Sequence, residues 1–174
     1  MSSTVYDRLR SLVGKDQPEI SATDEVCRQM IRHWCEAMED GNPLYTDEDY
    51  ARSSRYASIV APPPMIWSWV IPPLWPPAEM SPVYQQVFGA CAQGGFDQVI
   101  DTDVELDFHR PLFPGDRVRA VTRVHAVTDE KRTQLGDGHF VTLESVYMNQ
   151  LGGLVCTQRV TLFIYAPSAG PCST

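Results

Sequence analysis

The residues best equipped for acid and base chemistry lie in the stretch Glu39 to Ala51, which reads EDGNPLYTDEDYA. Asp40 supplies a carboxylate, Asn42 and Pro43 favour a turn, and Tyr45 supplies a hydroxyl. A tyrosine with a pKa near ~10 donates hydrogen bonds but accepts a proton poorly, whereas histidine near ~6.5 suits proton exchange. The stretch contains no histidine. It therefore predicts either a weakened acid-base site or a loop in which Asp40 only hydrogen-bonds the turn.

His109 is the candidate for a replacement base, because it directly precedes Arg110 and Pro111 at the end of an alternating apolar run. A lone histidine on a strand is more often a surface or structural residue, so both interpretations stay open. No cysteine has a recognisable partner, and no serine lies in a Gly-x-Ser-x-Gly turn, which disfavours nucleophilic catalysis. The five cysteines, Cys172 included, form no Cys-x-x-Cys pair, so we expect reduced thiols and no metal site.

Composition narrows the class of protein. With 174 residues and 43% hydrophobic content, the chain can bury the core of one domain. The net charge is -8, and the 14 basic residues are scattered among 22 acidic ones, which disfavours nucleic-acid binding. The N-terminus lacks the apolar run of a signal peptide, and no segment approaches the ~20 apolar residues of a membrane span. We therefore expect a soluble, cytoplasmic protein.

Besides a short helix after Asp47, to about Ser54, three helical segments are predicted before residue 81. Tyr6 to Val13 has helical spacing, ends at Gly14, and belongs to an appendage over residues 1–20. A second helix is predicted from an N-cap at Thr23, with an apolar stripe of Val26, Met30, Trp34 and Met38. The third follows Pro62, Pro63 and Pro64: MIWSWVIPPL predicts a short buried helix, which later prolines turn into a stiff loop to Met80. Its indoles, including Trp67 and Trp69, could line a pocket for a bulky group, pack in the core or face a subunit.

Four later runs have the alternation of strands, at residues 96–109, 116–127, 140–149 and 154–165. Turn residues separate them, so successive runs could pair as antiparallel neighbours. Helices followed by a meander of strands predict an α+β fold, with a helix packed on one face of a curved antiparallel sheet. We assign residues 1–166 to one domain and 167–174 to a flexible tail.

Two motifs, in this order, resemble the MaoC-like hydratases and dehydratases, and the likeness covers nearly the whole chain. In that family the first motif is Gly-Asp-x-Asn-Pro-x-His, followed by an acid and an alanine. The second is Arg-Pro-x-x-Pro-Gly-Asp. The matching residues here are Asp40, Asn42, Pro43, Tyr45, Asp47 and Ala51, and then Arg110 to Asp116. The resemblance implies a single hot-dog fold, an antiparallel sheet wrapped around a central helix, in the style of the N-terminal half of two-part family members.

The resemblance also implies a chemistry, and this chain departs from it twice. Family members add water to a 2-enoyl thioester with the motif's aspartate and histidine, and a glycine amide at the central helix holds the thioester oxygen. Tyr45 replaces the histidine, and prolines, which have no N–H, replace the glycine. The Met65 amide could substitute. The implied substrate-binding residues are Asn42, Pro63, Met65, Trp67 and Trp69, and CoA enters only as part of the substrate, without a separate cofactor.

Our leading hypothesis is a subunit that forms the acyl pocket of a heteromeric enoyl-CoA hydratase, with the working Asp and His on a second hot-dog chain. The acyl group could be bulky, such as a steroid side chain. One alternative is a self-sufficient hydratase that uses Asp40 with Tyr45 or His109. Another is a scaffold that docks a thiolase or an aldolase. Whether the assembly is homomeric or heteromeric stays open.

Overall fold

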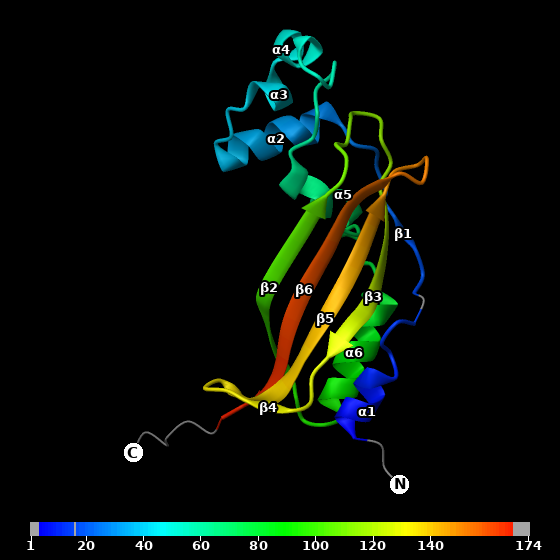
Figure 1. The fold of residues 1–174 in the computed structure, drawn as a ribbon, viewed down its shortest axis with the longest axis vertical. Coiled ribbons are helices and arrows are strands. Elements are labelled where there is room, and N and C mark those ends of the chain that lie inside the picture. The colour runs from blue at the N-terminus through cyan, green and yellow to red at the C-terminus, as the bar shows by residue number, and fades with distance from the viewer. Residues whose placement is uncertain (1–3, 16, 169–174) are drawn as a thin grey trace.

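A computed structural model describes residues 4–15 and 17–168 and shows an antiparallel sheet with helices on one face and at one end (Figure 1). The helices are α1 (Val5–Arg10), α2 (Arg28–Met38), α3 (Pro43–Thr46), α4 (Glu48–Ser53), the 3-10 helix η1 (Pro63–Met65), α5 (Ile66–Val70) and α6 (Pro82–Ala92). The strands are β1 (Ile20–Ser21), β2 (Gln98–Phe108), β3 (Arg119–Val127), β4 (Lys131–Arg132), β5 (Gly136–Met148) and β6 (Leu154–Pro167). None of the helices in these described ranges is long and apolar enough to cross a membrane.

The four long strands occur where the sequence predicts them, but one of them pairs with a different strand than expected. The sheet order is β1-β3-β5-β6-β2, with β4 paired to β5. The hairpins β3–β5 and β5–β6 are confirmed, whereas β2 pairs with β6 and not with β3. This places β2 at one edge of the sheet. The last strand runs to Pro167, so this residue belongs to the sheet and not to the predicted tail. Residues 169–174, which include Cys172, lie outside the described ranges.

The helix that packs on the centre of the sheet is α6, which the sequence analysis did not predict. Its residues Val83, Val87 and Cys91 recur every fourth position and are buried. They pack against inward-facing residues of the sheet, namely Val124, Val141, Leu143, Val160, Leu162 and Ile164. The helix predicted after Met65 is only α5, because Pro72 and Pro73 end it, and the chain returns to helical structure at Pro82. Between α5 and α6, residues 71–80 are exposed.

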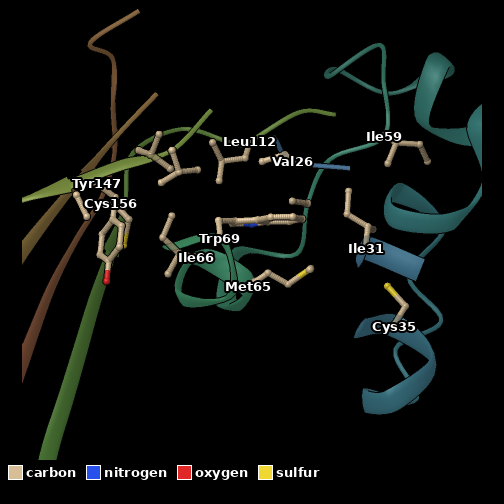
Figure 2. Close-up of a cluster of buried hydrophobic side chains, with 14 of the residues drawn as sticks. Val26, Ile31, Cys35, Ile59, Met65, Ile66, Trp69, Leu112, Tyr147 and Cys156 are labelled. Carbon is tan, nitrogen blue, oxygen red and sulfur yellow. The ribbon is translucent and has the colours of Figure 1, made fainter. Parts of the chain in front are cut away.

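A second cluster of buried side chains joins α2 to the sheet through α5. Figure 2 shows the Trp69 indole in the middle of this cluster, between Leu112 and Met65. The predicted start of α2 is wrong, and of its predicted stripe only Val26 and Trp34 contact the core. The backbone N–H of Ala22 donates to Val118 and that of Val26 to Asp116, so this segment runs beside the chain that leads into β3, and α2 begins only at Arg28. The helix buries Ile31 and Cys35, while Met30 and Met38 are exposed.

A charged side chain is buried on the outer face of the sheet. Glu144 of β5 is 4% exposed and accepts hydrogen bonds from Arg123 of β3 and Arg159 of β6. Burial alone would raise the pKa of this carboxyl, but the hydrogen bonds from the two arginines hold it below its ordinary value. The ionised form of Glu144 therefore stabilises the folded state.

We expect Glu144→Gln to lower the free energy of unfolding at neutral pH by about 1–3 kcal/mol, because Arg123 loses its carboxylate partner and Arg159 keeps only Glu105 among the described residues. Since the folded pKa is lowered, the contribution of Glu144 is present above the ordinary pKa near 4.5 and is lost as pH falls through the folded value. Denaturant unfolding at pH 7 and at acid pH measures the loss of stability in the variant and its dependence on pH. A difference between wild type and variant that is equal at the two pH values would contradict this assignment. Asp129→Asn, at an exposed position, is the control.

Candidate functional site

The predicted site residues Tyr45 and His109 meet in one pocket, which we call the loop pocket. It has a volume of about 280 Å³ and lies between α3, the chain from Arg55 to Pro63 that follows α4, and the chain at the end of β2. Its polar lining comes from Tyr45, Arg55, Tyr56, His109 and Arg110, and Pro63 also lines it. No carboxylate lines this pocket among the described residues. The loop pocket can therefore receive an anionic group, but it lacks the carboxylate and histidine pair of an acid-base site.

Asp40 serves the turn instead of the pocket. The carboxylate oxygen Oδ1 of Asp40 accepts a hydrogen bond from the Asn42 backbone N–H at 3.0 Å. Asn42 in turn caps α3, because its Oδ1 accepts from the Leu44 N–H at 3.1 Å. Both side chains thus fix the backbone of the loop that presents Tyr45. This is the turn interpretation that the sequence left open for Asp40.

Tyr45 is held in its protonated form. Burial raises the pKa of its hydroxyl, and the negative charge of Asp40 raises it further. The hydroxyl is therefore a hydrogen-bond donor near neutral pH and not a proton acceptor. His109 is exposed, and its Nε2 lies 3.4 Å from the Thr157 hydroxyl. Among the described residues that line the pocket, His109 is the single histidine.

The proposed substitute for the lost glycine amide is already occupied. The Met65 N–H donates to the carbonyl of Pro62 at 3.0 Å, and the Met65 side chain is fully buried in the core. Met65 is therefore not a free donor for a thioester oxygen, which corrects the expectation from the sequence. The second motif also has a structural role: Gly115 adopts a φ of +95°, and Asp116 Oδ2 accepts from the Phe113 N–H at 2.8 Å to close the turn.

The two tryptophans assigned to substrate binding have different places. Trp69 is 6% exposed, belongs to the cluster of Figure 2 and does not line the loop pocket, so its role in substrate binding stays a prediction. Trp67 lines a second, larger cavity of about 710 Å³, which we call the sheet cavity. One wall comes from α5, the exposed segment after it, and α6, and includes Val70, Pro72 and Tyr84. The floor is the inner face of the sheet, with Ala120, Thr122, Ser145, Tyr147 and Gln158.

The sheet cavity exists because the helix over the sheet is interrupted. A continuous helix from Ile66 to Ala92 would cover the strands, whereas here α5 ends at Val70 and α6 starts at Pro82. The volume falls within the ~300–1,000 Å³ of pockets that hold small molecules. The sequence analysis missed this cavity. The signal that could have found it was the spacing of Val83, Val87 and Cys91 after a proline, which indicates a second helix.

The family model that matches this sequence is described as FAS1-like, dehydratase domain region, and it matches residues 11–158. The chain belongs to this family. A probable enoyl-CoA hydratase alpha subunit of Thermomonospora curvata is 37% identical over 172 residues, covering 96% of this chain and 54% of that protein. The 3-oxo-4,17-pregnadiene-20-carboxyl-CoA hydratase alpha subunit of Mycobacterium tuberculosis is 31% identical over 161 residues, covering 92% of this chain and 51% of that protein.

Solved structures agree with the family assignment. The ChsH1-ChsH2 complex from Mycobacterium tuberculosis contains a chain that aligns with a TM-score of 0.86 at 27% identity, covering 96% of this chain and 94% of that chain. A MaoC-like dehydratase from Rhodospirillum rubrum aligns with a TM-score of 0.61 at 19% identity, covering 88% of this chain and 94% of that chain. The hot-dog fold and the MaoC-like resemblance are thereby confirmed. The FAS1-like dehydratase chain spans about half the length of the two curated relatives described above.

Proposed function

We propose that this chain is the acyl-pocket subunit of a heteromeric 2-enoyl-CoA hydratase whose acid-base residues belong to a second hot-dog chain. The names of the two relatives support hydration of an enoyl-CoA, and the complex of two chains in the similar structure supports a heteromer. The observation that carries the proposal is the loop pocket, which keeps the place of a hydratase site but lacks a carboxylate and holds a protonated tyrosine where the family has histidine.

The edge strand β2 provides a surface for the second chain. Ten of its 11 residues are exposed, among them Ile100, Val104 and Phe108 at 38%, 47% and 45%. An exposed, long and partly apolar edge strand is prone to pair with another strand, because its outer N–H and C=O groups have no partner strand. Pairing with the corresponding edge of a second hot-dog chain would cover both faces of β2 and continue the sheet.

The two cavities fit the two ends of an acyl-CoA. The loop pocket offers the guanidinium groups of Arg55 and Arg110 without an opposing carboxylate, which suits the anionic CoA portion. The sheet cavity offers apolar walls and room for a bulky acyl group, consistent with the ring-bearing acyl-CoA in the name of one relative. Ile66 of α5 lines the loop pocket and Trp67 the sheet cavity, so the two lie on either side of α5. CoA is then part of the substrate, and no separate cofactor is needed.

The test of this assignment is the double substitution Asp40→Asn and His109→Ala in the assembled protein. We expect kcat for hydration to change by less than about threefold, because Asp40 holds a turn that asparagine can also hold. Loss of a true general base would lower the rate by ~10²- to 10⁴-fold. A loss of that size, with unchanged assembly and thermal stability, would instead support the self-sufficient hydratase. The docking of a thiolase or an aldolase stays a prediction.

A further inference from the structure

A row of polar side chains crosses the inner face of the sheet, where buried residues are otherwise mostly apolar. Thr122 of β3, Ser145 of β5 and Gln158 of β6 occupy adjacent register positions. All three line the sheet cavity, directly beneath the interruption between α5 and α6. Polar groups on such a face lower stability unless they find hydrogen-bond partners, so their place in the cavity requires an explanation.

Gln158 is the member of this row that has an unused donor. Its side chain is 2% exposed, and its Oε1 accepts hydrogen bonds from the Trp67 indole N–H and, at 2.7 Å, from the Tyr147 hydroxyl. Because an indole N–H can only donate, these contacts fix Oε1 toward Trp67 and leave the Nε2 amide on the other side. Among the described residues, Nε2 has no hydrogen-bond partner, and Gln158 is one of the residues that line the sheet cavity. Two N–H donors thus belong to the cavity wall without a partner among these residues.

The neighbours of Gln158 do not compete for this amide. The hydroxyls of Thr122 and Ser145 bond to each other at 2.8 Å. Burial raises the pKa of Tyr147, so its hydroxyl stays protonated and keeps donating to Gln158. On the other side of Gln158, the paired residue of β2 is Leu106, which is apolar. The amide therefore stays available to an acceptor atom that a ligand brings into the sheet cavity.

We propose that Gln158 is a specificity-determining residue, and that its Nε2 amide receives an acceptor oxygen, such as a ring ketone, carried by the acyl group far from the thioester. This inference rests on the proposed function and names the substrate class more closely. A ketone can only accept, and the free amide can only donate, so the two are complementary. An acyl group without such an oxygen would leave the amide unpaired when water is displaced.

The test uses the assembled protein and two polycyclic acyl-CoA thioesters that differ only in a ring ketone replaced by a methylene. Binding of the saturated, unreactive pair is measured by calorimetry, and hydration of the unsaturated pair is measured in parallel. We expect the wild type to prefer the ketone by about tenfold in both assays. Gln158→Glu keeps an acceptor for Trp67 and Tyr147 but removes the donor, so the preference should fall to about one or below. Gln86→Glu, exposed on α6, makes the same chemical change outside both cavities and should keep the preference.

Gln158→Met is the second variant, because it keeps the side-chain length without adding a charge; its folding is checked by thermal unfolding. An unchanged ketone preference in either folded variant would overturn the inference, as would the absence of any preference in the wild type. If the wild type binds the ketone thioester more tightly but hydrates neither unsaturated thioester, the proposed function is overturned and the role of Gln158 in binding stands.

Discussion

Two charges placed on the edge strand, Ile100→Asp with Val104→Asp, are expected to weaken assembly with the second hot-dog chain by at least about 100-fold. Both side chains are exposed in the isolated chain, so the fold should tolerate the change. In the assembly they would be covered, and an uncompensated carboxylate buried in an apolar interface costs several kcal/mol. Ile100 and Val104 face opposite sides of β2, so the pair tests both faces of the proposed interface.

The matched control for this variant is Val13→Asp. Val13 is 39% exposed, close to the 38% of Ile100, but it bridges to Val124 of β3 near the opposite edge of the sheet. Sedimentation velocity and calorimetry of the mixed chains give the affinities. Equal binding by the edge-strand variant and the wild type would remove β2 from the interface. A wild-type chain that sediments alone as a dimer, and only as a monomer after the β2 substitutions, would show that the strand pairs with a second copy.

Filling the sheet cavity is expected to separate bulky from short substrates. Thr122→Phe places a phenyl ring on the floor of the cavity, so we expect kcat/KM for a polycyclic 2-enoyl-CoA to fall by about 100-fold or more. Crotonyl-CoA, whose acyl group is too short to require the cavity, should lose less than about threefold. The ratio of the two rates is the informative quantity, because a general loss of folding or assembly would reduce both.

Val121→Phe is the control for the cavity variant. Val121 is the neighbouring residue on β3, and alternation along the strand directs its side chain to the other face of the sheet. It should leave the ratio between bulky and short substrates unchanged. A proportional loss on both substrates by Thr122→Phe, with normal thermal stability, would contradict the assignment of the sheet cavity to the acyl group.

The sequence predicted the positions of the strands better than it predicted which strands pair, and the reason is physical. Alternation of Val104, Leu106 and Phe108 with charged residues identifies a strand and its two faces. It carries no information about which strand lies beside it, and β2 crosses to pair with β6 instead of continuing the meander. The start of α2 was misplaced for a similar reason, since the backbone around Ala22 bonds to Val118 of a distant segment.

The candidate site was predictable only in part. The motif residues Asp40, Asn42 and Tyr45 were identified from the sequence, and their capping and turn hydrogen bonds are local. The sheet cavity was not predicted, because it depends on where α5 stops and α6 resumes over the sheet. The place of Gln158 depends on the register of three strands, which a single sequence does not reveal.

The most direct test of the central claim is the rate of enoyl-CoA hydration, followed by the loss of absorbance of the conjugated thioester, for this chain alone and for its mixture with a second hot-dog chain that retains Asp-x-Asn-Pro-x-His. We predict that the chain alone gives less than about one hundredth of the rate of the mixture, because no carboxylate lines its loop pocket among the described residues and Tyr45 stands where the family motif has histidine. Addition of the chain should also raise the rate of the second chain on bulky substrates. A chain that alone hydrates the substrate as fast as the mixture would contradict the claim.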